Sequence, residues 1–500
     1  MRTAHAVADV RTAEHALMEL VPEGALMQRA AAGLASVCAR LLGHLYGARV
    51  VVLAGTGDNG GDALFAGARL ADRGARVAAV TAGSGLHDAG SAALRAAGGL
   101  VTTGGGPDRA AVIAGADLII DGILGIGGRG GLREPAATLA GLTAQAAKAG
   151  AVVVAADLPS GVDADTGAVA GAAIRADVTV TFGTLKPGLL VDPGASHAGT
   201  VELVDIGLRP HLAASPAVQA LQSPDVAALL PRPSAESDKY RRGVLGVLAG
   251  SQRYTGAAVL SVGGAIRGGA GMVRLVSAGP AADVVRQHWP EAVITVIDPQ
   301  DPAGAVKSAG RVQAWVAGPG LGTGDDAADL LAQVLATPLP VLVDADGLTV
   351  LSRRKDLLSR PDGAITLLTP HAGELARLMT GDHATIEANR LDSARGAAAE
   401  LGATVLLKGS TTVVATPDRD EPAFVNPTGT PWLATAGSGD VLSGLAGALL
   451  AQGLLPARSA ACAAAFLHGL AARLAARDAP VGAGDVLAAI PDAIRAVCGR

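Results

Sequence analysis

The sequence predicts an α/β protein of two domains, each built on a largely parallel sheet with helices on both faces. Its 500 residues are more than a single core usually serves. Short β-branched apolar runs alternate with Ala-, Leu- and Arg-rich helical segments in both halves, which favours parallel sheets covered by helices. A stretch containing Pro and Ser, residues 209–237, breaks this alternation. We therefore expect domains at 1–210 and 235–500, with a linker at 211–234.

The first half opens with a helical pattern over residues 12–45, where apolar side chains recur at helical spacing. Strand-like runs then alternate with helical segments. The expected strands of this half are 50–54, 77–82, 118–121, 152–157 and 178–182, with a short closing strand at 200–207.

The second half shows a second series of alternating strands and helices. Its Ala-rich end, from Asp440 onward, is expected to be helical. The expected strands are 244–250, 271–278, 292–298, 311–318, 340–346, 364–370, 403–409 and 411–417.

Composition limits the compartment and the partners. Forty basic and 45 acidic residues give a net charge of −5, which is no reason to expect nucleic acid or a membrane as partner. The three cysteines lie far apart without metal-ligand spacing, as fits a reducing cytoplasm. The N-terminus has no apolar signal core, and the Gly-interrupted tract at 441–457 fits a buried helix. The terminal helices can pack within one chain or between chains, and we expect a cytoplasmic homo-oligomer.

Four loops of the first half follow predicted strands, at the edge where open parallel sheets bind ligands. These loops are 55–63, 121–131, 157–167 and 183–188. Their side chains include an amide, several carboxylates and a hydroxyl, a set that suits a hard cation. The polar residues are Asn59, Asp62, Asp121, Asp157, Ser160 and Lys186.

Asp157 directly follows a hydrophobic strand, so partial burial would suit it to act as a base. The stretch GTGDNGGDA, at 55–63, would cradle phosphate on backbone N–H groups, although its spacing matches neither usual nucleotide fingerprint. The alternative is that the Asp and Ser residues only cap helices and that Lys186 is a surface turn residue beside Pro187.

Taken together, these loops resemble the N-terminal domain of the NAD(P)H-hydrate epimerase family, over about residues 10–210. The family's NNGGDG reads DNGGDA here, with Asp58 and Ala63 as departures, whereas DLPSGVDADTG at 157–167 matches closely. The resemblance implies a Rossmann-like three-layer sandwich. It also implies inversion of the carbon that bears the hydroxyl added to a damaged nicotinamide ring, with Asp157 working at that carbon.

The same resemblance implies the binding residues. Asn59, Asp121 and Ser160 would hold K⁺, for structure or for positioning the nucleotide. Lys186 would help to place the phosphates or the carboxamide. The residues that would contact the hydrated nucleotide are Asp58, Asn59, Gly60, Gly61, Asp62, Gly125, Ile126, Gly127, Gly128, Arg129, Gly130 and Gly131.

The clearest motif of the second half is NPTGTPWLATAGSGD, residues 426–440. AGSGD precedes a long helical run, so its N–H groups form an anion site with Asp440 beside it. A carboxylate there can take a proton from a hydroxyl while a phosphoryl group is stabilised. The alternative is that Asp440 is a helix N-cap.

Four further motifs carry polar or glycine-rich loops. KGSTT at 408–412 suits a nucleotide phosphate or ribose, or is simply the turn of a hairpin. GPGLG at 318–322 ends a strand and leaves room for a ligand. TPHAGE, at 369–374, places His371 where a helix begins, as a site residue or a structural one. DADGL at 344–348 adds two carboxylates that hold Mg²⁺ through water or cap a helix.

In this order the motifs resemble the ribokinase-like superfamily and, more narrowly, the NAD(P)H-hydrate dehydratases, over about residues 235–490. KYRRGVLGVLAGS and YTGAA, between 239 and 258, complete the match, and Trp432-Leu433 stand where the family often has Gly-Met. The resemblance implies that ADP or ATP, with Mg²⁺, phosphorylates the ring hydroxyl so that phosphate can leave. We expect ADP.

The resemblance again implies site residues. The hydrated nucleotide would lie near Ala258, Gly320, Gly322, His371 and Asp440. The residues along which the adenine nucleotide would lie are Lys408, Gly409, Ser410, Thr411, Thr412, Ala436, Gly437, Ser438 and Gly439.

The two halves support each other, because a stereospecific dehydratase acts on one epimer and an epimerase supplies it from the other. Two other interpretations remain open. One is a small-molecule kinase of the ribokinase type, which leaves residues 10–210 unexplained. In the other, the first half is a nucleotide-binding regulatory or scaffolding module without catalysis.

Overall fold

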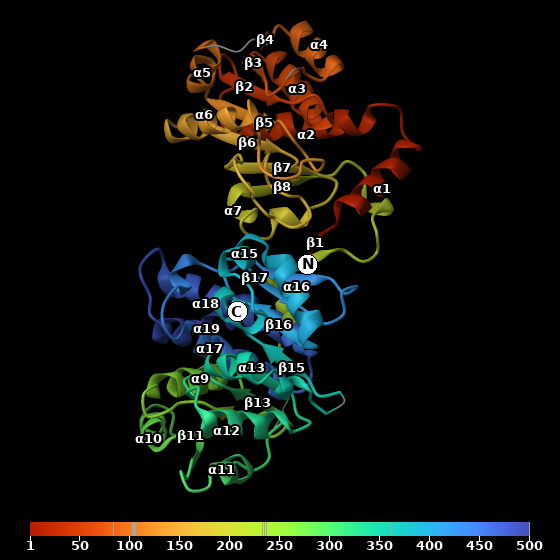
Figure 1. The fold of residues 1–500 in the computed structure, drawn as a ribbon. Helices are drawn as coiled ribbons and strands as arrows, with labels where there is room; N and C mark the ends of the chain where they lie inside the picture. The colour runs from red at the N-terminus through yellow and green to blue at the C-terminus, as the bar shows by residue number, and fades with distance from the viewer. Residues whose placement is uncertain are drawn as a thin grey trace. The chain divides into compact units, whose positions relative to one another are not determined.

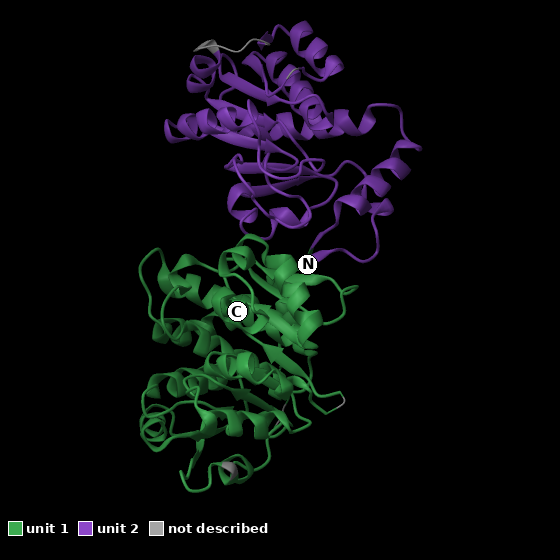
Figure 2. Ribbon diagram, viewed as in Figure 1, with its two compact units in different colours: residues 1–2, 219–500 green, residues 3–218 purple. Residues whose placement is uncertain are grey.

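The computed structural model describes residues 1–499 except 84, 103–106, 233, 235, 237 and 362. The chain divides into two compact units, which Figure 2 colours separately. The smaller unit is Thr3–Val218, and the larger unit is Gln219–Arg500 together with Met1–Arg2. Each unit is built on its own sheet (Figure 1).

The smaller unit contains a seven-stranded sheet in the order β4-β3-β2-β5-β6-β7-β8, and every neighbouring pair is parallel. All six expected strands are confirmed, and β4 is additional because its three residues are too few to show a pattern. The strands are β2 (Arg49–Ala54), β3 (Arg76–Thr81), β4 (Leu100–Thr102), β5 (Leu118–Gly122), β6 (Val152–Ala156), β7 (Val178–Phe182) and β8 (Thr200–Val204).

The helices of the smaller unit are α1 (Val7–Met18), α2 (Ala25–Leu42), α3 (Asp58–Ala71), α4 (Asp88–Ala96), α5 (Pro107–Ala114), α6 (Ala136–Lys148) and α7 (Ala195–Ala198). The helical pattern expected over 12–45 is confirmed, as two helices and not one continuous helix. Pro22 and Gly24 separate α1 from α2, and Gly24 takes the left-handed φ of 76° before α2 begins.

Strand β2 shows how the sheet becomes the middle of three layers. Val50 and Val52 lie in one hydrophobic core with residues of α2 and α3. Val51 and Leu53 lie in a second core with residues of α5 and α6. Because successive side chains of a strand point to opposite faces, this apolar run needs helices on both sides. The three-layer sandwich is therefore confirmed.

The larger unit contains an eleven-stranded sheet in the order β1-β9-β18-β17-β16-β15-β14-β13-β10-β11-β12. Its expected strands are confirmed, but the sheet is not parallel throughout, because β16, β17 and β18 pair antiparallel. The strands are β1 (Arg2–Ala4), β9 (Val218–Ala220), β10 (Val244–Leu248), β11 (Met272–Ser277), β12 (Val293–Val296), β13 (Ala314–Ala317), β14 (Val341–Val343), β15 (Thr366–Leu368), β16 (Thr404–Leu407), β17 (Thr412–Ala415) and β18 (Ala423–Asn426).

The core of the larger unit joins the sheet mainly to α9, α17, α18 and α19, and it also includes buried residues of α8 and α10. Eleven of the fourteen residues of α17 are buried, which confirms the buried helix expected at its apolar tract. The helices are α8 (Ser223–Leu229), α9 (Thr255–Arg267), α10 (Gly279–His288), α11 (Pro302–Ser308), α12 (Asp325–Leu335), α13 (Asp346–Arg353), α14 (Ala372–Met379), α15 (His383–Ala388), α16 (Arg390–Leu401), α17 (Ser438–Ala451), α18 (Ala457–Ala476) and α19 (Ala483–Val497).

The segment expected to be a linker, 211–234, instead carries β9 and α8. Ser223 and Pro224, which favour a linker by composition, form the first turn of α8, where a proline costs no hydrogen bond. Residue 233 lies outside the described residues. By length and composition α18 could cross a membrane, but 72% of its apolar window is buried inside the unit, as in a core helix.

Candidate active sites of the two units

The site of the smaller unit lies where the strand order reverses. β2 is flanked by β3 on one side and by β5 on the other, so a crevice opens at their carboxyl ends. The loops after β2, β5, β6 and β7 leave from this edge of four neighbouring parallel strands. The topology therefore brings the polar loops of the first half together, as expected.

The Gly-rich stretch is shorter as a loop than expected, because α3 begins at Asp58. A Cβ on Gly60 would lie 2.2 Å from the carbonyl oxygen of Gly55, and one on Gly61 would lie 2.9 Å from Met27 Cε. Gly60 is needed for close packing of the helix start, because a Cβ there would meet backbone, whereas the Met27 side chain opposite Gly61 can move. Phosphate would meet the first turn of α3 rather than an open glycine loop.

Asp121 and Ser160 form a buried hydrogen-bonded pair. Ser160 Oγ donates to Asp121 Oδ1 at 2.6 Å, and Ser160 N donates to Oδ2 at 2.8 Å. Burial raises the pKa of Asp121 to about 6, and the hydrogen bonds from Ser160 oppose that rise. Ser160 Oγ also accepts from Leu124 N at 2.9 Å, so it joins the loops after β5 and β6 and caps no helix.

Asn59 completes this group. A Cβ on Gly125 would lie 3.3 Å from Asn59 Oδ1, so the amide lies against the loop that Ser160 holds. Both polar atoms of the Asn59 side chain are buried and have no hydrogen-bond partner among the described residues. A buried unpaired amide is costly unless a ligand satisfies it. Its oxygen, with the oxygens of Asp121 and Ser160, fits a hard cation.

Asp157 is clamped by the segment that follows β7. Its Oδ1 accepts hydrogen bonds from Lys186 Nζ at 2.5 Å, Thr181 Oγ1 at 3.1 Å and Phe182 N at 3.3 Å. Lys186 is 2% exposed and Asp157 10% exposed in their side chains. The alternative that Lys186 is a surface turn residue is therefore wrong, and Asp157 caps no helix.

Three further carboxyl groups surround Asp157. Burial raises the pKa of Asp62 well above its ordinary value, and Asp157 and Asp58 raise it further. Burial also raises the pKa of Glu14, on α1, whereas Lys186 lowers it. Glu14 lies outside the sequence motifs. They could not predict it, because only the tertiary fold brings α1 to the site.

In the larger unit, two glycine-rich segments meet at the end of β10. Gly250 N donates to Pro319 O at 2.8 Å, which ties this end to the GPGLG loop. A Cβ on Gly320 would lie 2.8 Å from both Ala257 Cβ and Tyr254 Cβ. GPGLG therefore lies against the start of α9, where Ala258 is fully buried. This brings together two of the segments expected to bind one ligand.

Asp440 lies in the first turn of α17, and Gly437 is the N-cap, with φ 85° and no side-chain cap. The N-cap alternative for Asp440 is therefore wrong, and the helix start keeps N–H groups free of a side-chain cap. Burial raises the pKa of Asp440 to about 7, Asp344 raises it further, and Lys408 opposes the rise.

Lys408 links Asp440 to three other motifs. Its Nζ lies 2.7 Å from Asp344 Oδ1 and 3.6 Å from Glu374 Oε2. A Cβ on Gly439 would lie 3.4 Å from Nζ, so the ammonium is beside the start of α17. Burial lowers the pKa of Lys408, but Asp344 and Glu374 raise it more. The result is a lysine ammonium at a helix N-terminus, an arrangement suited to phosphate.

Two side chains of this site have structural roles as well. His371 is the N-cap of α14, and its Nδ1 accepts from Gly373 N at 3.0 Å. Asp346 Oδ2 accepts from Gly322 N at 2.9 Å, so DADGL holds the GPGLG loop. Ser443 Oγ donates to Asp344 Oδ2 at 2.6 Å, and no sequence motif singles Ser443 out.

KGSTT is the turn of a hairpin, because β16 and β17 pair antiparallel on either side of it. The fully buried Arg390 of α16 holds this turn from behind. Its Nη2 donates to Lys408 O at 2.7 Å, and its Nε donates to Thr411 O at 3.2 Å. The hairpin interpretation is confirmed. It does not conflict with nucleotide binding, because the turn places Lys408 in the site.

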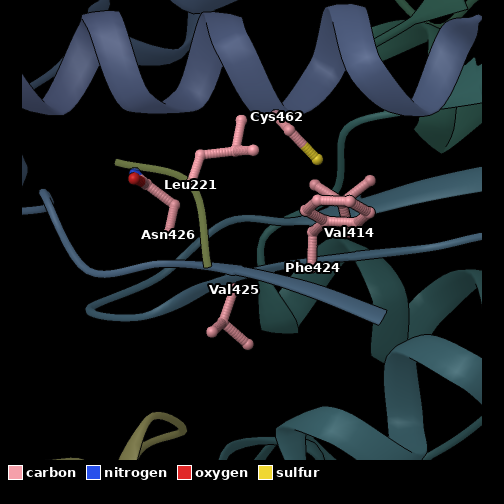
Figure 3. A pocket seen from close by; sticks show the side chains of 6 residues that line it. All are labelled: Leu221, Val414, Phe424, Val425, Asn426 and Cys462. Carbon is pink, nitrogen blue, oxygen red and sulfur yellow. The ribbon is translucent and has the colours of Figure 1, made fainter. Parts of the chain in front are cut away.

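Two cavities among the described residues of the larger unit lie away from Asp440, Lys408 and Asp344. The one in Figure 3 has a volume of about 10 Å³, room for about one water, between α18 and the β17–β18 pair. Its lining residues are Leu221, Val414, Phe424, Val425, Asn426 and Cys462. A wider hollow of about 530 Å³ follows α14, α15 and α16 and contains none of the expected site residues.

Fold and sites together define a class: a two-site α/β enzyme that handles nucleotide-like ligands at the carboxyl edges of its sheets. Residues 245–493 match the family model described as NAD(P)H-hydrate dehydratase, and residues 23–188 match the model described as YjeF-related protein N-terminus. The larger unit resembles a ribokinase-like superfamily protein from Enterococcus faecalis, with TM-score 0.51 and 23% identity, covering 57% of this chain and 98% of that one.

Relatives over the whole length are more similar. The chain is 48% identical over 494 residues to the bifunctional NAD(P)H-hydrate repair enzyme Nnr of Mycobacterium leprae, covering 97% of this chain and 96% of that protein. It is 47% identical over 470 residues to the protein of the same name from Mycobacterium tuberculosis, covering 92% of each. The chain belongs to the family of bifunctional NAD(P)H-hydrate repair enzymes.

Proposed function

We propose that this chain repairs hydrated NADH and NADPH with two active sites. The smaller unit, expected as the domain 1–210, interconverts the R and S forms. The larger unit, expected as the domain 235–500, dehydrates the S form with an adenine nucleotide as phosphoryl donor. The observation that carries the proposal is that both units hold a carboxylate near a lysine ammonium at the carboxyl edge of the sheet: Asp157, in contact with Lys186, and the half-buried Asp440 at the start of α17, near Lys408.

In the smaller unit, Asp157 would work at the hydroxyl-bearing carbon by accepting and returning the proton of its hydroxyl group. The exposed side chains of Asp58, at the start of α3, and Arg129, in the loop after β5, lie at the same edge and support contacts to the nucleotide. Gly60 and Gly61 would contribute backbone only, since they start α3. The remaining contacts would come from Asn59, Asp62 and residues 125–131.

We propose that Asn59, Asp121 and Ser160 hold K⁺. The unpaired Asn59 amide supports this, because it lies against a loop that Ser160 and Asp121 fix. A bound K⁺ would satisfy the buried oxygens and hold the start of α3 against the loop after β5. Without the ion, the residues of this site would contribute to the reaction only through Asp157.

In the larger unit, the chemistry follows from the leaving group. Hydroxide leaves poorly, whereas phosphate leaves well, so phosphorylation of the ring hydroxyl allows the reduced nicotinamide to re-form. Asp440 would take the hydroxyl proton, and the N–H groups of 437–439 with Lys408 would stabilise the transferred phosphoryl group. The hydrated nucleotide would lie near Ala258, Gly320, Gly322 and His371, and the adenine nucleotide along 408–412 and 436–439.

We expect Mg²⁺ to accompany the adenine nucleotide and to neutralise phosphate charge. Within the described ranges, no group of three or more His, Cys, Asp or Glu could hold a metal by itself. This supports an ion bound largely through the phosphates, as Mg²⁺ usually is in such sites. We propose ADP as the donor and the cytoplasm as the compartment, with which the free cysteines agree.

The first experiment gives the purified chain both epimers of hydrated NADH with Mg²⁺, K⁺ and either ADP or ATP. Recovery of the nicotinamide absorbance is followed to completion. Full recovery with one donor would establish both activities and identify the donor. Recovery that stops at the fraction present as one epimer would mean that the smaller unit does not epimerise. No recovery with either donor would refute the repair function and favour a small-molecule kinase.

A further inference from the structure

The hydrogen bonds that hold the Asp157 carboxylate reach only one of its two oxygens. All three donors that reach the carboxylate, from Lys186, Thr181 and the Phe182 amide, converge on Oδ1. Among the described residues none donates a hydrogen bond to Oδ2. The backbone of Asp157 has the left-handed φ of 61°, a conformation that is unfavourable for a residue with a side chain. The carboxylate is therefore fixed by one oxygen, and the other oxygen is available for a reaction.

Lys186 has no donor left for a ligand. An ammonium has three N–H groups, and those of Lys186 reach Asp157 Oδ1, Thr181 Oγ1 and Phe182 O. The last two distances are both 3.1 Å. The lysine is also less exposed than the carboxylate it holds. This argues against the expectation that Lys186 places phosphates or the carboxamide of the substrate.

The charges around Asp157 explain why a cation is needed there. Asp62, on α3, and Glu14, on α1, both lie close enough to interact electrostatically with it. Like charges at short range disfavour an ionised carboxylate, and a contacting ammonium favours it. Lys186, from the segment after β7, provides that ammonium in direct contact.

We propose that Lys186 is a positioning residue for epimerisation, an inference that rests on the proposed function of the smaller unit. With Thr181 and the Phe182 amide it holds Asp157 by Oδ1, so that Oδ2 alone exchanges the proton of the substrate hydroxyl. Oδ2 takes the proton of the hydroxyl, the O–H electron pair forms a C=O bond, and the bond from that carbon to the ring nitrogen breaks with its electron pair moving to nitrogen. The nitrogen then re-forms the bond on the opposite face of the carbonyl carbon, and the proton returns to the oxygen. The centre is inverted and no co-reactant is consumed.

The test uses the full chain with Lys186→Met, Lys186→Arg and Thr181→Val, and with Lys148→Met on the exposed end of α6 as matched control. We expect Lys186→Met to lower kcat for epimerisation about 100-fold, with KM changed by less than about threefold, because the base is misplaced and not the binding site. The acidic limb of the epimerisation pH profile should move to higher pH. Dehydration of the S form, measured in the same sample, should be unchanged.

Thr181→Val keeps the lysine and removes one donor, so we expect a loss of roughly tenfold in kcat and a smaller shift of the profile. If Lys186→Met prevents folding of the smaller unit, Lys186→Arg and Thr181→Val carry the test through their pH profiles. Unchanged kcat and profile in the folded variants would overturn the proposal, as would a rise in KM alone. If the unaltered chain shows no epimerisation at all, the proposed function itself is refuted. That outcome can be recognised without any variant.

Discussion

Asp440 combines two features that a base in phosphoryl transfer needs, a helix N-terminus beside it and a pKa raised to about 7. Burial is the larger cause of the rise, and Asp344 adds to it. Below that pKa the side chain carries a proton and cannot accept another. Above it, the carboxylate is available, and Lys408 offsets part of its charge.

We therefore expect kcat/KM for dehydration to increase with pH through about 7, at saturating adenine nucleotide and Mg²⁺. Below pH 6 the increase should approach tenfold per pH unit, because the free enzyme must lose one proton. Asp440→Asn should remove the acidic limb and lower kcat by roughly 1,000-fold. A flat profile between pH 5.5 and 8 in the unaltered chain would contradict the assignment of Asp440 as the base.

Asn59 permits a second prediction at the scale of one residue. Asn59→Ala removes the unpaired amide that we assign to K⁺, so the K⁺ concentration for half-maximal epimerisation should increase roughly tenfold. Titrations with KCl against choline chloride measure this, with the thermal shift caused by K⁺ as a second readout. Dehydration of the S form in the same samples is the control. An unchanged K⁺ dependence would place the ion elsewhere.

At the scale of elements, the hairpin of β16 and β17 depends on a residue of α16. Arg390 is fully buried, yet its guanidinium meets carbonyl oxygens on both sides of the turn and the Glu387 carboxylate of α15. A Cβ on Gly409 would lie 2.1 Å from Arg390 Nη2. The shape of the turn thus requires both an arginine behind it and a glycine within it.

Arg390→Ala should leave buried carbonyl groups unpaired and destabilise the larger unit by about 3 kcal/mol. Gly409→Ala should displace the arginine and weaken adenine nucleotide binding roughly tenfold. Gly396→Ala, also on α16, is the matched control, since a Cβ there meets nothing within 4 Å. Calorimetric titration with ADP and a thermal melt measure both effects. Equal affinities in all three variants would show that the turn does not bind the nucleotide.

At the scale of the whole molecule, each unit has its own sheet, its own hydrophobic core and its own candidate site. Asp157 belongs to the smaller unit and Asp440 to the larger one. The two activities should therefore be separable by single substitutions in the full chain.

Asp157→Asn should abolish epimerisation and leave dehydration of pure S form within about twofold of the unaltered chain. Asp440→Asn should do the reverse. An equimolar mixture of the two variants should restore complete repair of both epimers, because the substrate diffuses freely between molecules. Chiral chromatography of the two epimers and nicotinamide absorbance measure the two steps. If either substitution abolished both activities, the assignment of one activity to each unit would be wrong.

The expected homo-oligomer is a separate prediction for the whole molecule. Light scattering of the purified chain should give a mass that is a multiple of the chain's 49.1 kDa. A mass of one chain at micromolar concentration would refute it, and the Ala-rich terminal helices would then pack within one chain only.

Much of the fold was accessible from the sequence, because strands and helices follow from short-range periodicity. The runs at β2, β5 and β6 are mostly apolar and rich in Val and Ile, as is typical of a strand buried on both faces. The errors have local causes as well. One long helical pattern hid the break at Pro22, and Ser223-Pro224 resembled a linker although it starts a helix.

The sequence by itself determined the order of strands and helices, the carboxylates at the strand ends and the family resemblance, since each depends on neighbours within a few residues. Only the tertiary structure decided how Lys186 and Arg390 are used. Lys186 meets a residue 29 positions away, and Arg390 meets a turn 18 to 21 positions away. The physical reason is burial. A charged side chain removed from water must find its partners across the fold, and spacing along the chain does not encode that distance.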